Sequence, residues 1–212
     1  MSSKSVPDET KVYNIIVDYL KDKRELRLDS VIPHLKNKLR NSHFDINNEI
    51  IINVLRSLIQ QKLIVEGSRL VRYDLLNIPK RREIYRFIVN NPGVYHYEII
   101  KQLDISSNAV IWHLKVLKIF KLIKEIDVDN HDIYCDKGVS FSKVKKNYFL
   151  RREKSQKIIS TLNNERDGMT KTALSRTLNM HFNTVEKYLK ALQEIGVIIK
   201  EKMGNKTLYS II

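Results

Sequence analysis

Residues 106–123 read SSNAVIWHLKVLKIFKLI, and this stretch decides the fold. Val110, Leu114 and Leu117 recur at intervals of four and three residues, the spacing of one face of an α-helix. Two further apolar residues, Leu122 and Ile123, follow where a strand begins. The stretch therefore predicts an amphipathic helix that leads directly into a hydrophobic strand.

The same spacing occurs three times in this chain of 212 residues. Around each central leucine, an apolar residue stands four positions before, a leucine three positions after, and an apolar pair eight and nine positions after. The other two sets are Val185, Leu189, Leu192, Val197 and Ile198, and Ile51, Leu55, Leu58, Leu63 and Ile64. Three sets with common offsets indicate three homologous units.

Each copy predicts the same order of elements around this helix. A first helix is expected over residues 12–20, 82–89 and 157–162, and a second helix ends at Leu103 or Leu178 in the later copies. A hairpin follows the third helix, with Gly67-Ser68 and Gly204-Asn205 as turn signals. Three helices followed by a hairpin form the winged helix-turn-helix arrangement.

Short polar turns separate the second and third helices. Asp104 and Asn179 stand where the chain leaves the second helix, and both residue types tolerate the left-handed conformation. Ser106 is expected to cap the next helix. In the third copy His181 occupies that place, and Asn183 with Glu186 is expected to form a shifted capping box.

The predicted fold class is therefore mainly α with small β wings, in three tandem winged helix-turn-helix domains. We expect a divergent first domain over residues 1–78, a second over 79–138, and a basic linker or helix plus a third domain over 139–212. The connector over residues 140–162 contains no proline or glycine and predicts one long helix, with a packed linker as the alternative.

The stretch NNPGVYHYEIIKQLDISSNAVIWHLKVLKIFKLI, residues 90–123, resembles prokaryotic and especially archaeal winged-helix regulators of the ArsR/MarR type. The resemblance includes the Asn-Pro-Gly turn, the serine before the third helix and the pair His113-Leu114. It is clear over 79–137 and 150–212 and weak over 8–78. Those regulators have glycine before the apolar pair. Gly196 matches, whereas Lys62 and Lys121 do not, so the third helix is expected to end differently in the first two copies.

This resemblance implies a cytoplasmic transcription regulator that binds double-stranded DNA. The third helix would lie in the major groove, and the hairpin wing would reach phosphates or the minor groove. The charge agrees, because the chain has 38 Lys and Arg against 24 Asp and Glu, and residues 139–212 hold 15 of the basic and 6 of the acidic groups. A basic excess in one third favours a polyanionic partner, although a solubilising surface is the alternative.

The third copy offers the most convergent set of candidate DNA contacts. Asparagine pairs with adenine, and lysine contacts guanine or phosphate. The candidates in the second helix, third helix and wing are Lys171, Thr172, Arg176, Asn183, Thr184, Lys187, Lys190, Lys202 and Lys206. Glu186 and Glu194 leave open a merely solvated polar helix, because carboxylates repel phosphate.

The first two copies are less suited to DNA. The first offers Asn53 and Arg56 on its third helix, with Arg69 and Arg72 in its wing, and the second offers Asn108 and Lys115. The second copy also places Ile111, Trp112 and Ile119 on the outer face of that helix, and its wing is acidic, with Glu125, Asp127, Asp129 and Asp132.

Three interpretations of Trp112 remain open. It packs against a neighbouring domain, a second copy of the chain or another protein; it contacts a DNA groove; or it folds onto its own hairpin as core. We favour the first interpretation, a dimer or interdomain contact, with a homodimer or protein partner through the second domain, because exposed aromatic and aliphatic side chains are typical interface anchors.

Several classes of protein are not indicated. The six glycines form no phosphate-binding loop, and the histidines lack metal-ligand spacing with a cysteine, so we expect no enzyme, no cofactor and no metal site. The first ten residues lack the apolar core of a signal peptide, and no apolar run is long enough for membrane insertion. Cys135 is the single cysteine, which suits a reducing cytoplasm.

A rival function belongs to a different class. Tandem winged helices also build protein–protein scaffolds, such as subunits of membrane-trafficking complexes of the ESCRT-II kind and of transcription machinery. Trp112, Ile111 and the acidic second wing favour that alternative.

Overall fold

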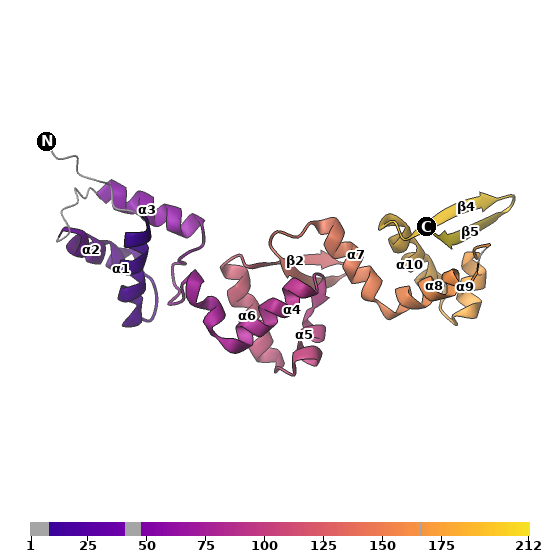
Figure 1. Cartoon of the computed structure of the whole chain (residues 1–212), viewed down its shortest axis with the longest axis horizontal. Coiled ribbons are helices and arrows are strands. Elements are labelled where there is room, and N and C mark those ends of the chain that lie inside the picture. The colour runs from indigo at the N-terminus through magenta and orange to yellow at the C-terminus, as the bar shows by residue number, and fades with distance from the viewer. Residues whose placement is uncertain (1–8, 41–47, 166) are drawn as a thin grey trace. The chain divides into compact units, whose positions relative to one another are not determined.

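The structure is a computed structural model that describes residues 9–40, 48–165 and 167–212 (Figure 1). The first eight of the residues considered for a signal peptide lie outside this range. The chain forms two compact units, one comprising residues 1–87 and 97–124 and the other residues 88–96 and 125–212.

The first unit is helical where it is described. Its elements are α1 (Glu9–Lys21), α2 (Leu28–Arg40), α3 (Asn48–Gln60), the 3-10 helix η1 (Arg72–Asn77) and α6 (Ser107–Ile119). Two helices cross the boundary between the units, α4 (Pro79–Asn90) and α5 (His96–Leu103). The apolar faces of α1, α2 and α3 form one core, in which Ile16, Leu35 and Ile51 are fully buried.

The second unit combines helices with short strands. Its elements are β1 (Val94–Tyr95), β3 (His131–Asp136), α7 (Phe141–Arg151), α8 (Glu153–Asn163), α9 (Lys171–Thr177), α10 (Phe182–Glu194), β4 (Ile198–Met203) and β5 (Lys206–Ile211). The strand β2 (Ile123–Val128) begins at the unit boundary and completes a sheet of order β1-β3-β2, while β4 and β5 pair with each other. One core runs through this unit and includes Val128, Phe149 and Leu189.

The mostly helical content with small antiparallel sheets confirms the predicted fold class at that level. The repeated apolar positions within the third helix of each copy are buried, as the periodicity predicted. Val110, Leu117 and Leu192 are fully inaccessible to solvent, and so are Ile51 and Val185. None of the helices in the described ranges is long and apolar enough to cross a membrane.

The third helix of each copy ends in the same geometry. Lys62, Lys121 and Gly196 all adopt left-handed backbone conformations, with φ of 57°, 53° and 68°. The amide of the following residue then donates to a carbonyl five positions earlier, at 3.0 Å from Leu63 to Leu58, Leu122 to Leu117 and Val197 to Leu192. This is the Schellman ending of a helix. The expectation that the helix ends differently in the first two copies is therefore wrong, because lysine takes the position usually held by glycine.

The turns before these helices are confirmed in conformation but not in capping. Asp104 and Asn179 are left-handed, with φ of 50° and 47°. Ser106 stands at the N-cap position of α6, yet its side chain makes no capping bond. In α10 the cap is His181, whose Nδ1 accepts from the Asn183 amide at 3.3 Å. The predicted serine cap of α6 and the predicted Asn183–Glu186 capping box of α10 are therefore both wrong.

The hairpin expected after the third helix of the first copy is not formed. Residues 61–71 contain turns and no strand, and residues 72–77 form the helix η1. Gly67 is at the predicted turn, but its amide donates to the Leu26 carbonyl at 2.9 Å, and the Leu26 amide donates to the Ser68 carbonyl at 3.0 Å. The segment thus pairs with the α1–α2 loop instead of with itself.

The connector is not one helix. Ser140 caps α7, with its hydroxyl accepting from the Lys143 amide at 3.4 Å. Arg152 is extended, with φ −68° and ψ 129°, and it separates α7 from α8. The physical reason is packing, since Tyr148, Phe149 and Ile158 all enter one core and a straight helix has a single core-facing stripe.

Candidate nucleic-acid interface

The helices α9 and α10 form a helix-turn-helix with a fixed turn. The Thr170 hydroxyl caps α9 by accepting from the Ala173 amide at 3.2 Å. The Ser175 hydroxyl donates to the Met180 carbonyl at 2.6 Å and ties the end of α9 to the turn. Left-handed Asn179 then redirects the chain into α10. The apolar face of α10 is buried, so its opposite face is directed outward.

The wing is attached to this helix-turn-helix by a short bridge. The amides of Met169 and Tyr209 each donate to the other's carbonyl at 2.9 Å. Gly168 permits this approach, because a Cβ there would lie 2.8 Å from the Tyr209 carbonyl oxygen. Beyond the bridge, β4 and β5 pair as far as Met203 and Lys206, which leaves the predicted Gly204-Asn205 turn at the tip.

The structure brings the predicted residues of the third copy into one unit. Thr184 and Lys171 are half-buried, and the others are exposed on α9, α10, β4 and β5: Thr172, Arg176, Asn183, Lys187, Lys190, Lys202 and Lys206. The wing cations Lys202 and Lys206 form no ion pair with any residue in the described ranges.

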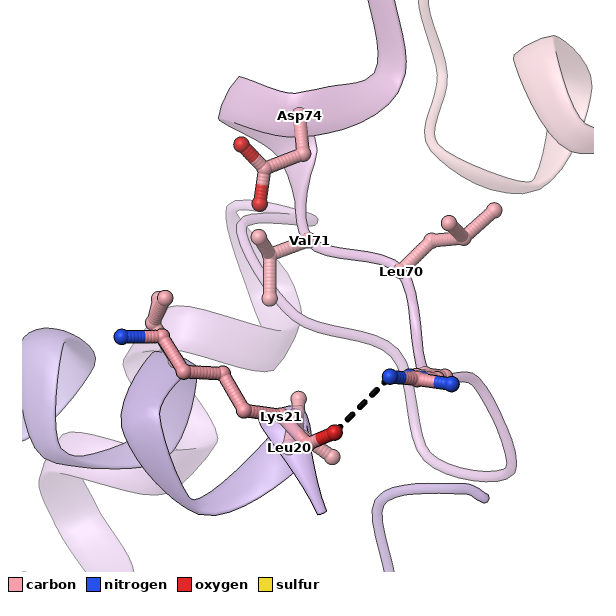
Figure 2. Close-up of a pocket in the computed structure, with 7 residues that line it drawn as sticks. Leu20, Lys21, Leu70, Val71 and Asp74 are labelled. Atoms are coloured by element: carbon pink, nitrogen blue, oxygen red, sulfur yellow. Dashed lines mark hydrogen bonds between the residues drawn. The ribbon is translucent and has the colours of Figure 1, made fainter. Parts of the chain in front are cut away.

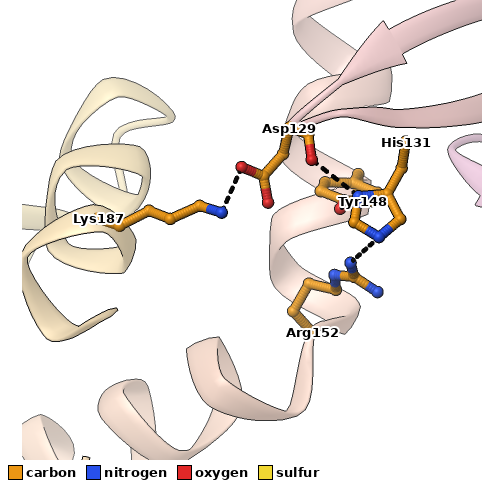
Figure 3. Close-up of polar contacts among 5 residues, drawn as sticks. All are labelled: Asp129, His131, Tyr148, Arg152 and Lys187. Carbon is orange, nitrogen blue, oxygen red and sulfur yellow. Dashed lines mark hydrogen bonds and ion pairs between the residues drawn. The ribbon is translucent and has the colours of Figure 1, made fainter. Parts of the chain in front are cut away.

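Two of the predicted cations are paired within the chain. Lys171 Nζ lies 2.7 Å from Glu186 Oε1 and 4.0 Å from the centre of the Phe182 ring. Lys187 Nζ lies 2.5 Å from Asp129 Oδ1, at the tip of the β2–β3 hairpin (Figure 3). The sequence offered one signal for this second pair, the acidic Asp129-Asn130 turn, which we interpreted as unfavourable to DNA and not as a partner of α10.

A third ion pair joins α10 to the connector. Lys145 Nζ lies 2.6 Å from Glu194 Oε2, and this hydrogen bond lowers the pKa of the Glu194 carboxyl below its ordinary value. Between the Lys187–Asp129 and Lys145–Glu194 pairs lies a groove of about 460 Å³, lined in part by Asp127, Phe149 and Lys190. Glu186 and Glu194, the carboxylates that argued against DNA on this helix, are therefore both paired with lysines of the same chain.

The predicted residues of the first copy do not gather into a comparable surface. Asn53 and Arg56 are exposed on α3 and bond to each other at 3.3 Å. Arg69 Nη2 donates to the Lys21 carbonyl at 2.8 Å, beside a pocket of about 250 Å³ (Figure 2). Arg72 Nη1 donates to the Phe120 carbonyl at 3.2 Å. Both arginines thus satisfy backbone carbonyls, and the pocket is smaller than the ~300 Å³ at which ligand sites usually begin.

On α6 the predicted interface residues are exposed. Asn108 and Lys115 are exposed as well, and the exposed fractions of Ile111, Trp112 and Ile119 are 53%, 50% and 40%. Trp112 is therefore not core, which removes the third interpretation. Its ring instead covers Arg81, whose guanidinium carbon lies 4.8 Å from the ring centre. Sequence reasoning missed Arg81, because nothing local in PKRR distinguishes a buried arginine from an exposed one.

Comparison with known proteins agrees with a helix-turn-helix regulator. No protein-family model matches the chain. Over 131 residues the chain is 31% identical to an uncharacterized HTH-type transcriptional regulator of Methanocaldococcus jannaschii. The match covers 62% of this chain and 33% of the relative, so the chain spans about a third of the length of the curated relative it matches. The similarity supports a relationship to archaeal helix-turn-helix transcriptional regulators.

Proposed function

We propose that this protein is a sequence-specific, double-stranded-DNA-binding transcription regulator of the archaeal cytoplasm. It is built from three tandem winged helices of the ArsR/MarR type over residues 1–78, 79–138 and 139–212. The repeated Schellman endings after Leu58, Leu117 and Leu192 support three related units. The similarity to an HTH-type regulator supports the function.

The observation that favours DNA most strongly is the arrangement of α10 beside its wing. Asn183, the residue best suited to adenine, is exposed at the first turn of α10, where recognition helices contact base edges. Lys202 and Lys206 project from the wing that the Met169–Tyr209 bridge ties to the same helix-turn-helix. Base contacts thus come from α10 and phosphate contacts from α9 and the wing.

Glu186 and Glu194 do not oppose this function. Each carboxylate is bound by a lysine of the same unit, Lys171 or Lys145, so its charge is compensated locally. Exposed cations remain in excess on this surface, and phosphate contacts by lysine and arginine supply most of the affinity of such proteins.

The test is a fluorescence-anisotropy titration of the full chain against mixed-sequence duplex DNA at several salt concentrations. A DNA-binding regulator gives a linear log–log plot with a slope of several units, about 0.9 per phosphate neutralised. The triple variant Lys190→Ala, Lys202→Ala, Lys206→Ala should lower both the affinity and the slope. The control, Lys154→Ala, removes one exposed cation of α8, outside the predicted surface. Absence of binding by the natural chain at low salt would reject the proposal.

The surface of α6 favours a second candidate function, that of a protein–protein scaffold. Exposed Ile111, Trp112 and Ile119 lie on one helix, and clustered apolar side chains of this kind are typical of protein interfaces. Sedimentation equilibrium of the natural chain and of Trp112→Ala tests a homodimer, which the substitution should weaken. If the natural chain is a monomer at all concentrations, the α6 surface does not form a homodimer.

A further inference from the structure

The tip of the β2–β3 hairpin faces α10 within the second compact unit, and the Lys187 side chain reaches across to it (Figure 3). Asp129 Oδ1 is 2.5 Å from Lys187 Nζ. The carboxylate is nearly enclosed, with 14% of the Asp129 side chain exposed against 52% for Lys187. A carboxylate oxygen of the same chain is therefore paired with the amino group for which we propose a DNA contact.

The hairpin tip is held in place by its own contacts. Asp129 and Asn130 are both left-handed, with φ of 59° and 58°, as in the two-residue turns that fit the twist of a hairpin. His131 Nδ1 lies 2.8 Å from the Asp129 carbonyl oxygen, and Arg152 Nη2 lies 3.2 Å from His131 Nε2. Arginine only donates, so Nε2 accepts and the ring proton is on Nδ1, from which it is donated to Asp129.

Arg152 and Tyr148 fix this histidine from the side of the connector. The Arg152 guanidinium lies 4.7 Å from the centre of the Tyr148 ring, and the Tyr148 hydroxyl lies 3.2 Å from His131 Nδ1. Burial raises the pKa of Tyr148 to about 12, so its hydroxyl stays protonated. The turn is thus preorganised to present Asp129, and this lowers the entropy that its contact with Lys187 costs.

A phosphate group and the Asp129 carboxylate compete for the same cation. The Lys187 ammonium has three N–H donors, but a carboxylate bound to it neutralises its charge and repels an approaching phosphate. Asp127 adds a second carboxylate to the groove beside α10. We propose that the β2–β3 hairpin competes with nucleic acid for Lys187. The Asp129 carboxylate is paired with Lys187 in the free protein, and duplex DNA displaces the carboxylate when it binds. This inference rests on the proposed DNA-binding function.

The decisive comparison is between Asp129→Asn and Asp132→Asn in the full chain. Asparagine tolerates the left-handed conformation of position 129, so the turn is retained while the ion pair is lost. Asp132 is an exposed residue of the same hairpin, and its substitution removes the same charge without touching the pair. We expect Asp129→Asn to tighten DNA binding about 3- to 10-fold, and Asp132→Asn less than about 2-fold.

The same pair of residues gives an internal check. In a Lys187→Met background, Asp129→Asn should change affinity less than about 1.5-fold, because the partner of the carboxylate is already gone. Hydrogen exchange supplies a readout without any variant: DNA should accelerate exchange over residues 125–136, since the tip is released when DNA binds.

The outcomes separate the two ideas. If the natural chain binds DNA but Asp129→Asn and Asp132→Asn change affinity equally, or if DNA leaves exchange in the hairpin unchanged or slower, the competition is wrong and the DNA-binding function stands. If no chain binds DNA at low salt, the proposed function fails and the inference fails with it.

Discussion

The guanidinium of Arg81 lies 4.8 Å from the centre of the Trp112 ring, fully buried beneath a tryptophan that is itself half exposed. Nη1 of Arg81 donates to the Leu75 carbonyl at 3.1 Å, and Nε and Nη2 have no hydrogen-bond partner among the described residues. Trp112 therefore covers a buried cation and is also a surface residue.

Arg81→Met should leave the free energy of unfolding unchanged or raise it by about 1 kcal/mol, because an uncompensated buried charge costs more than one hydrogen bond and a cation–π contact return. Trp112 is the sole tryptophan, so denaturant unfolding followed by its fluorescence measures the effect directly. A loss above about 2 kcal/mol would mean that the guanidinium is fully partnered in the folded protein.

Acid should destabilise the first unit through His113. Burial lowers the pKa of His113, and the charges of Arg81 and Lys80 lower it further. The unfolded chain therefore takes up a proton below about pH 6.5 that the folded chain refuses, so stability falls as the pH drops from there toward the lowered folded-state value. His113→Phe should reduce this fall in unfolding free energy between pH 7 and pH 5. Equal slopes for the two proteins would contradict the prediction.

The lysine at the end of α6 is strained. Lys121 is left-handed at a position that favours glycine, so Lys121→Gly should stabilise the protein by about 0.5–1 kcal/mol. Lys115→Gly is the matched control, since it removes an exposed lysine from the interior of the same helix and should destabilise by about 1 kcal/mol. Urea denaturation compares the two, and a destabilising Lys121→Gly would count against the Schellman ending.

Two glycines are required by close backbone contacts. A Cβ at Gly93 would lie 2.9 Å from the Val144 carbonyl oxygen, and one at Gly168 would lie 2.8 Å from that of Tyr209. Both have positive φ, so Gly168→Ala and Gly93→Ala should each cost about 3 kcal/mol. Gly67→Ala, with the same sign of φ but open space around it, should cost only about 1 kcal/mol. Thermal melts in which the three variants lose the same stability would contradict the close backbone contacts at Gly93 and Gly168.

Asn183 and Lys202 should affect DNA binding differently. Asn183→Ala should cost about 1–3 kcal/mol on a preferred sequence and relax base discrimination, because asparagine reads a base edge. Lys202→Ala should weaken binding to all sequences alike and lower the salt slope by about 0.9. Titrations against a selected and a scrambled duplex measure both effects. Sequence-blind losses from both variants would contradict base recognition by α10.

Much of the fold was predictable because helical periodicity is a local property. The spacing of Val110, Leu114 and Leu117 predicts a buried stripe whatever lies elsewhere, and the stripe is buried in all three copies. The absence of the expected hairpin from the first copy was not predictable in this way. The segment expected to form it pairs with the loop at Leu26, and such a choice between partners depends on residues remote in sequence.

The sequence by itself determined the repeated helices, the left-handed turns at Asp104 and Asn179, and a basic final third with Asn183 on the outer face of its helix. Only the tertiary structure decided that Arg81 is buried under Trp112 and that Lys187 meets Asp129. The reason is physical: the pattern of apolar residues fixes which face of a helix is buried, whereas the pairing of charges depends on how separate elements pack together.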